Sequence, residues 1–254
     1  MSNLQHQLHE LYITFMQLVF LLLQPNVFVP LSILFIFLFI KNRKYKRTAY
    51  YQITKNSYLS VRRDLGKFGE YLTYKRLKHL ENEGAKFLFN LYIPKSDGQT
   101  TEIDVLLISP KGLFVFESKN YSGWIFGSEY QKTWYQTLPA GRGESHKIKF
   151  HNPVMQNKGH IKHLKSLIGA DYLIHSIIVF SDRCQLMNVE LKSHDIKVIN
   201  RYNIKETVSQ IYNAEVSTPL STSTILELYE QLYPFSQADT SVKQKHIENI
   251  HTVI

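Results

Sequence analysis

Two acidic side chains interrupt apolar runs that otherwise resemble buried β-strands. Asp104 lies within the run TEIDVLLI and Glu117 within LFVFESK, and the sequence SPKG separates the two runs. SPKG is typical of a tight turn, and a hairpin with Ser109 opposite Gly112 makes Asp104 face Glu117. Because side chains alternate across a strand, both carboxylates share one sheet face, with Cβ atoms roughly 5 Å apart.

Two carboxylates this close repel each other unless a cation lies between them. Mg²⁺ is the expected ion, with Mn²⁺ as a substitute, since hard divalent cations prefer oxygen ligands. Lys119 lies two residues beyond Glu117 and points to the same face, and the same register places Glu102 opposite Lys119. An ammonium there can orient a water or stabilise charge on a phosphate, so these groups suit phosphodiester hydrolysis.

The alternative is a solvated sheet face on which Lys119 only balances the charge of Asp104 and Glu117. Against it, apolar residues fill both faces of the strand at positions 105–108, and unpaired carboxylates are rarely buried. Because Glu-x-Lys alone is a weak motif, geometry leaves both interpretations open.

The elements around these residues predict a single α/β domain with a mixed sheet flanked by helices. LGKFGEYLTYKRLKHLENEG has a helical stripe and ends at Gly84. The stripe consists of Leu65, Gly69, Leu72, Thr73, Leu77 and Leu80. Glu70 borders it, so this carboxylate is placed next to the sheet. The predicted strands are LFNLYI, TEIDVLLI, LFVFESK, YSGWIFG, WYQTL, YLIHSIIVF and DIKVI.

The second half adds helices and polar connections. NPVMQNKGHIKHLKSLIG reads as a helix with proline at its first position, and further helices are predicted at 204–212 and 221–232. The segment between Leu138 and Ile148 is predicted as a loop. The polar tail, residues 236–254, is expected to be loosely ordered.

Residues 1–40 form a predicted membrane anchor. No charge occurs between Glu10 and Lys41, and residues 18–40 are long enough for one span but too short for two. Pro25 and Pro30 are expected to kink the helix or to mark its start. A cleaved signal peptide is the weaker alternative, because a basic n-region and a small-residue cleavage site are absent.

A basic juxtamembrane linker is predicted at residues 41–64, and its part from Tyr50 to Arg63 is expected to be a linker or a short helix. Its cluster consists of Lys41, Arg43, Lys44, Lys46 and Arg47. Such clusters stay on the cytoplasmic side, which predicts a single-pass protein of the cell membrane with a cytoplasmic C-terminal domain. The cluster is also suited to anionic lipid head groups, an interpretation that competes with nucleic-acid binding by the same residues.

Charge and cysteine usage limit the class of protein. The net charge is +9, but residues 41–86 hold 13 Lys/Arg against 4 Asp/Glu, and residues 87–254 hold 17 against 16. The single cysteine, Cys184, excludes an internal disulfide framework. Absence of G-x-S-x-G, Walker and paired C-x-x-C motifs disfavours acyl hydrolases, P-loop enzymes and zinc ribbons. High Lys, Asn, Ile and Tyr usage is typical of low-GC bacteria.

The chain resembles the nuclease-related (NERD) domain family, a branch of the restriction-endonuclease-like PD-(D/E)xK nucleases. GKFGEYLTYKRL, TEIDVLLISPKGLFVFESKNYSGWIFG and NPVMQNKGHIKHL carry the resemblance, which covers residues 65–181 within a domain of 65–235. It implies a restriction-endonuclease-like mixed sheet and an Mg²⁺-dependent site in which Asp104 and Glu117 hold the metal. Lys119 would position the water, Glu70 would add a carboxylate, and Gln156 would lie near the metal or the phosphate. Ile103 replaces the proline of the superfamily motif.

Nucleic acid, DNA rather than RNA, is the expected partner. The predicted phosphate contacts are Arg142, Lys158, Lys162 and Lys165, although a helical charge run is most often only a solvated face. Four histidines near Gln156, at 146, 151, 160 and 163, match no standard zinc spacing. Tyr121, Trp124 and Trp134 could stack on bases, yet aromatic residues in short strands are more often core.

These patterns favour a membrane-anchored, metal-dependent endonuclease. Two alternatives stay open: a catalytically inactive nucleic-acid-binding module tethered to the membrane, and a membrane scaffold whose basic segment binds only lipid.

Overall fold

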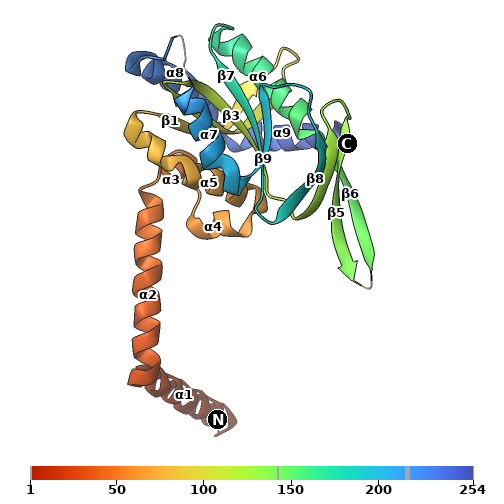
Figure 1. The fold of residues 1–254 in the computed structure, drawn as a ribbon. Coiled ribbons are helices and arrows are strands. Elements are labelled where there is room, and N and C mark those ends of the chain that lie inside the picture. Colours follow the sequence, from red (N-terminus) through yellow and green to blue (C-terminus); the bar gives the residue numbers. More distant parts are fainter. Residues whose placement is uncertain (1, 142, 215–217, 254) are drawn as a thin grey trace. The chain divides into compact units, whose positions relative to one another are not determined.

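The computed structural model describes residues 2–141, 143–214 and 218–253. The chain divides into two compact units, Met1–Thr48 and Ala49–Ile254 (Figure 1). Arg142, a predicted phosphate contact, lies outside the described residues.

The first unit contains two helices, α1 (Ser2–Leu23) and α2 (Pro25–Lys46). The predicted span at residues 18–40 is interrupted, because α2 begins with Pro25 at its first turn after the extended Gln24. Pro30 lies inside α2. Within the described residues, α2 is the one helix long and apolar enough to cross a membrane, and its apolar window has no buried side chains.

The second unit begins earlier than the sequence predicts. Residues 41–64 are not a linker throughout: α2 runs to Lys46, and α3 (Ala49–Thr54) and α4 (Tyr58–Arg63) follow. Tyr50, Ile53 and Val61 are buried. The apolar residues of this segment therefore belong to the domain core, which moves the domain boundary from residue 65 to residue 49.

The predicted first helix of the domain is α5 (Leu65–Leu77), continued by the 3₁₀ segment η1 (Lys78–Glu83). Its stripe is buried at Gly69, Thr73 and Leu77, as expected, whereas Leu65 is 62% exposed. Gly84 ends the element with a φ of 86°, a left-handed conformation that glycine adopts without strain.

The predicted mixed sheet flanked by helices is confirmed. It has five strands in the order β1-β2-β3-β7-β9. The strands are β1 (Lys86–Pro94), β2 (Thr100–Ser109), β3 (Gly112–Lys119), β7 (Ile174–Phe180) and β9 (Ile196–Asn200). β1, β2 and β3 are antiparallel, and β3, β7 and β9 are parallel. Ser109 pairs with Gly112, as the turn sequence predicts.

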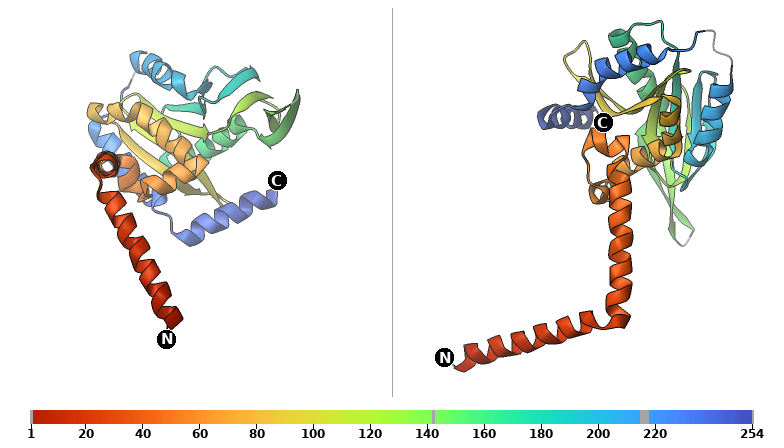
Figure 2. Two further views of the ribbon diagram at one scale, coloured as in Figure 1. Left: turned by 90° about the horizontal axis from the view of Figure 1, so that it is seen from below. Right: turned by 90° about the vertical axis from the view of Figure 1, so that its left-hand side faces the viewer.

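The structure adds a second, four-stranded sheet in the order β6-β5-β4-β8. Its strands are β4 (Gly123–Ser128), β5 (Thr133–Gly141), β6 (Glu144–His151) and β8 (Cys184–Glu190). The predicted loop between Leu138 and Ile148 is wrong, because these residues pair across β5 and β6. The hairpin projects from the body of this unit as an arm (Figures 1 and 2).

Helices cover both faces of the five-stranded sheet. The remaining ones are α6 (Pro153–Ile168), η2 (Arg201–Asn203), α7 (Ile204–Asn213), α8 (Thr222–Ser236) and α9 (Thr240–Val253). On β3, Ser118 lies next to Gly69 of α5, whereas the neighbouring Glu117 binds His160 of α6. Because adjacent side chains point to opposite faces, α5 and α6 lie on opposite sides of β3.

The C-terminal tail is not loosely ordered. It forms α9, whose His246 is 7% exposed and lies at the ring edge of Tyr92, 5.4 Å between centroids. His246 Nδ1 is 3.0 Å from Thr100 Oγ1, so contacts with the sheet hold the tail in place.

Candidate active site

The candidate site lies where β2 and β3 part. Their ladder runs from the turn to the pair Val105–Phe116, and the described register contains neither the predicted pair Asp104–Glu117 nor a pairing beyond it. Asp104 Oδ2 instead accepts a hydrogen bond from the backbone N–H of Ser118, at 2.8 Å. The observed register therefore agrees with the predicted one up to Val105–Phe116, and the ladder ends before the predicted pair Asp104–Glu117.

Asn90 on β1 binds two further carboxylates of this region. Its φ of 50° lies in the left-handed region, and the β1–β2 ladder skips it between the pairs Phe89–Val105 and Leu91–Ile103. Asparagine tolerates this conformation better than other non-glycine residues. Its Nδ2 donates to Glu70 Oε2 at 3.0 Å and to Glu102 Oε1 at 3.3 Å. Glu102 pairs with Tyr92 of β1 on one side, and the β2–β3 ladder ends before the predicted position of Glu102 opposite Lys119.

Glu117 and Lys119 form a buried ion pair at the end of β3. Lys119 Nζ is 2.6 Å from Glu117 Oε1, and the Glu117 side chain is 1% exposed. His160 Nε2 lies 3.1 Å from Glu117 Oε2, and its Nδ1 is 2.6 Å from Thr101 Oγ1. Burial alone would raise the pKa of Glu117, but Lys119 and then His160 hold that pKa down at about 2.

Lys119 also contacts the residue expected beside it. Its Nζ lies 3.1 Å from Gln156 Oε1, in the first turn of α6. Burial lowers the pKa of Lys119, but Glu117 and Asp104 outweigh burial and raise that pKa above its usual value. The ammonium is therefore charged at all physiological pH values.

Asp104 and Glu70 are held closer to their neutral forms. Burial raises the pKa of Asp104 well above its ordinary value, and repulsion from Glu117 and Glu70 adds to this effect. Burial and then repulsion from Glu102 raise the pKa of Glu70 to about 8. Glu70 Oε2 accepts hydrogen bonds from Tyr50 Oη at 3.1 Å and from Asn90 Nδ2. Glu70 therefore retains a proton at neutral pH.

The donor set fits a hard divalent cation. The charges that act most strongly on Asp104 are three carboxylates and a single ammonium. Mg²⁺ usually keeps several waters and takes only one or two protein carboxylates, together with substrate phosphates. Among the described residues no three His, Cys, Asp or Glu side chains form a ready-made metal cage. A divalent cation here would therefore have few protein ligands and an open coordination shell.

Comparison with known proteins bears on this arrangement. The family model of the nuclease-related domain matches residues 65–181. This part of the chain is a nuclease-related domain. The chain is also similar to an uncharacterised protein of Bacillus anthracis, with 29% identity over 186 residues, which cover 73% of this chain and 84% of that protein. No solved structure shows a significant match.

The nuclease-related domain brings together the five residues that the sequence indicated for chemistry. Lys119 contacts Glu117 and Gln156, and the charges of Glu117, Glu70 and Lys119 act on Asp104. Their catalytic roles stay predictions.

Three residues of the same site escaped the sequence analysis. Tyr50, Asn90 and Thr101 bind the carboxylates or their partner histidine. A polar Asn90 inside the apolar run LFNLYI was the available signal.

The predicted phosphate contacts have different surroundings. Lys158 Nζ is 2.7 Å from Glu129 Oε1, an ion pair that ties α6 to the turn after β4. Glu129 also accepts the backbone N–H groups of Lys192 and Ser193. Lys158 therefore has a structural partner, whereas Lys162 and Lys165 are exposed on α6.

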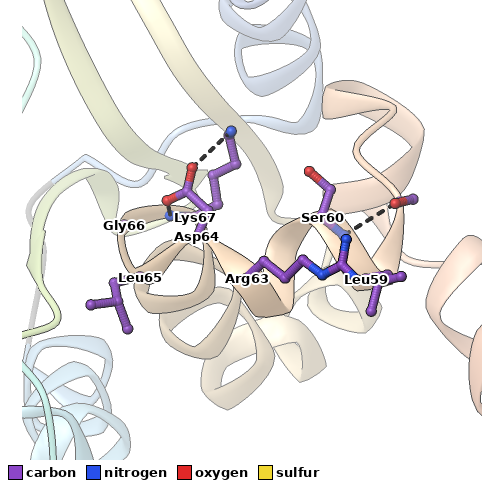
Figure 3. A pocket seen from close by; sticks show the side chains of 8 residues that line it. Leu59, Ser60, Arg63, Asp64, Leu65, Gly66 and Lys67 are labelled. Carbon is purple, nitrogen blue, oxygen red and sulfur yellow. Dashed lines mark hydrogen bonds and ion pairs between the residues drawn. The ribbon is translucent and has the colours of Figure 1, made fainter.

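A separate hollow lies at the turn between α4 and α5 (Figure 3). It has a volume of about 730 Å³, and its lining residues are Ser57, Leu59, Ser60, Arg63, Asp64, Leu65, Gly66 and Lys67. Asp64 caps α5 and binds Lys67 Nζ at 2.8 Å on its rim. The hollow contains none of the clustered carboxylates. The candidate active site is therefore at the ends of β2 and β3 and not in this hollow.

Proposed function

We propose that the nuclease-related domain hydrolyses phosphodiester bonds of DNA, with RNA as the less favoured substrate, in the presence of Mg²⁺ or Mn²⁺. One observation carries the proposal: Asp104 lies among three other carboxylates and a single ammonium where β2 and β3 part. Buried negative charge of this kind is stable only with protons or a cation. Asp104 and Glu117 would hold the ion, which supplies positive charge to the phosphate and lowers the pKa of a bound water.

Lys119 orients the attacking water or a phosphate oxygen in this proposal. An ammonium has three N–H donors, and in the described part of the chain two of them point to Glu117 and Gln156. The third is left for the substrate. Because Glu117 and Gln156 both fix its position, Lys119 needs little reorganisation when charge develops on the phosphate.

Glu70 acts as a proton store beside these groups. Its Oε2 accepts two hydrogen bonds, so the proton that its raised pKa retains belongs on Oε1. Loss of this proton adds a negative charge next to Asp104. Hydrolysis consumes one water: its oxygen forms the new P–O bond, the bond from phosphorus to the leaving oxygen breaks, and the proton that the water loses balances the proton that the leaving oxygen takes up.

Cleavage by the full chain in detergent tests the proposal. We expect plasmid and linear DNA to be cut with Mg²⁺ or Mn²⁺ and to stay intact in EDTA. Glu117→Gln and Lys119→Met should each reduce the rate at least 100-fold, on the order of a lost transition-state contact. Glu227→Gln, on the exposed face of α8, is the matched control. Cleavage that persists in both site variants would refute the assignment of the activity to this site, and no cleavage by the wild type would leave an inactive nucleic-acid-binding or scaffold protein.

We also propose that α2 crosses the cell membrane once, with the unit Ala49–Ile254 in the cytoplasm. The 22 residues of α2 give a length of about 33 Å, which matches a bilayer core of about 30 Å. Its apolar side chains are exposed on all sides, with Phe35 at 70% and Ile33 at 62%. Three basic residues lie in its last turn, namely Arg43, Lys44 and Lys46. Such residues favour the cytoplasmic side.

We propose that these three residues, together with Lys41 and Arg47, contact anionic lipid head groups. Each basic residue near the membrane surface contributes about 1 kcal/mol to the binding free energy. Membranes from cells that express the full chain provide the experiment. The protein should stay with the membranes in alkaline carbonate, and protease should reach the domain only after the cytoplasmic face is opened. Digestion from the outside of intact cells would refute the orientation.

A further inference from the structure

The outer face of the four-stranded sheet carries an ordered array of aromatic and basic side chains. Paired residues of neighbouring strands share a face. The register gives one row of Gln185, Trp124, Thr137 and Lys147, and a second row of Asn188, Phe126, Tyr135 and Lys149. We call this surface the outer face. The opposite face, with Ile125 and Trp134, packs into the core against Phe180.

The aromatic side chains of the outer face are accessible. Trp124 is 47% exposed, whereas Trp134, the other tryptophan, is fully buried. Trp124 Nε1 donates to Gln185 Oε1 at 3.1 Å, so the indole edge is fixed. Phe126 and Tyr135 are partly exposed beside it. An exposed indole held by its edge can offer its ring face to another flat group.

The basic side chains lie on one border of the aromatic ones. Lys147 and Lys149 belong to β6, the edge strand, and both are exposed. Lys147 Nζ lies 4.0 Å above the Tyr135 ring, a cation–π contact that holds the lysine over the sheet. Aromatic residues flanked by a line of cations are typical of surfaces that bind single-stranded nucleic acid.

Strand β6 leads directly to the candidate active site. It ends at His151, on the same face as Lys147 and Lys149, and Asn152 then caps α6. Gln156, in the first turn of α6, binds Lys119. From Lys147 to His151 the strand rises about 13 Å, so the cations form a short path that ends beside the catalytic groups.

We propose that the outer face binds single-stranded nucleic acid, with bases stacked on Trp124 and the backbone along Lys147 and Lys149. The inference rests on the proposed nuclease function and specifies its substrate: a strand whose bases are unpaired next to the cleavage site. Duplex DNA hides its base faces, so it would contact only the lysines. Among the described residues of the two rows, the cations, Lys147 and Lys149, lie on the border that leads to the site, which a protein partner would not account for.

Tryptophan fluorescence measures this binding without cleavage. The full chain in detergent and EDTA is titrated with oligodeoxythymidylate, whose bases stack little on one another. We expect quenching of the exposed Trp124 and an unchanged signal from buried Trp134. Trp124→Phe should abolish the quenching. Quenching that persists in Trp124→Phe would overturn the proposal.

Affinity, measured with a labelled oligonucleotide, provides the second readout. Trp124→Ala should weaken single-strand binding about 5- to 150-fold, the range for one stacked base. Tyr202→Ala, an aromatic residue 56% exposed on η2, is the matched control and should have no effect. Replacing both Lys147 and Lys149 by Ala should reduce the slope of log affinity against log salt by about 1.4.

The outcomes separate this inference from the proposed activity. If the oligonucleotide binds as expected but no DNA is cut, the outer face stands and the nuclease proposal fails. If DNA is cut but Trp124→Ala binds single strands like the wild type, the outer face is refuted and the nuclease proposal stands. The lysine variant could lose duplex and single-strand binding to the same extent, while Trp124→Ala has no effect. The outer face would then contact only phosphates, and the proposal of single-strand binding would be refuted.

Discussion

Replacing Glu70 by glutamine should stabilise the protein while impairing the site. Folding raises the pKa of Glu70 from 4.5 to about 8. At pH 7 the folded protein therefore holds a proton that the unfolded chain has released. At 1.36 kcal/mol for each pKa unit, the cost at pH 7 is about 1.36 × 2.5, or about 3 kcal/mol. Glutamine removes this cost and resembles the neutral acid.

The structure supports this replacement. Both hydrogen bonds, from Tyr50 and Asn90, reach Oε2, which the amide oxygen of glutamine can replace. The amide NH₂ then takes the place of the protonated Oε1. The variant keeps the shape and hydrogen bonds of the folded acid, so the expected gain is not offset by a cavity or an unpaired acceptor.

The sign of the pH dependence follows from the raised pKa. An acid with a folded pKa above its unfolded pKa binds more protons in the folded state, so it destabilises the fold as pH rises from 4.5 to about 8. The free energy of unfolding of the wild type should fall across this window relative to that of Glu70→Gln. Above pH 8 the two profiles should run parallel.

Denaturant unfolding of the full chain in detergent across this pH window is the measurement. Glu227→Gln, which removes an exposed carboxylate of α8, controls for the change in net charge. A Glu70→Gln variant that is no more stable than the wild type at pH 7, or that loses stability with pH at the same rate, would refute the assignment of a stored proton to Glu70.

Further predictions concern the same network and the C-terminal helix. Lys119→Met should lower the free energy of unfolding by about 3–5 kcal/mol, because it leaves the Glu117 carboxylate buried without the ammonium of Lys119. Lys162→Met, at an exposed position, is the control and should leave the free energy of unfolding almost unchanged. Mn²⁺ binding at neutral pH should release the proton of Glu70, measured by calorimetry in buffers of different ionisation enthalpy; equal heats in all buffers contradict this. His246→Ala should speed amide exchange of α9, since it removes contacts with Thr100 worth about 1–2 kcal/mol; unchanged exchange argues against the anchor.

Features set by neighbouring residues in the chain were predictable. The turn SPKG fixes the start of the β2–β3 ladder, because its residue types favour a tight hairpin. The stripe along α5 places Glu70 against the sheet through helical periodicity alone. Asn152 before α6 and Pro153 at its first position predicted where this helix begins, and with it the position of Gln156 in the first turn.

Features that depend on distant pairing were not predictable from these patterns. The left-handed Asn90 interrupts the β1–β2 ladder, the hydrogen bond from Ser118 to Asp104 lies where the β2–β3 ladder has ended, and neither leaves a periodic signal. The second sheet needs the parallel pairing of β4 with β8, which are about 60 residues apart. The hairpin of β5 and β6 was predicted as a loop, because apolar and polar side chains do not alternate along the exposed edge strand β6 before Ile148.

The position of Tyr50 has a practical consequence for work on this protein and its relatives. The recognised domain starts at residue 65, yet Tyr50 packs against Tyr71 and Phe89 and its hydroxyl binds Glu70. A truncated protein cut at the family boundary would lack one wall of the carboxylate cluster and expose aromatic rings to water. Such a fragment should aggregate or lose its divalent-ion response even if the chemistry is intact in the whole chain. Truncations intended for biochemistry should therefore start at Ala49, and inactivity of a shorter piece should not be read as inactivity of the family.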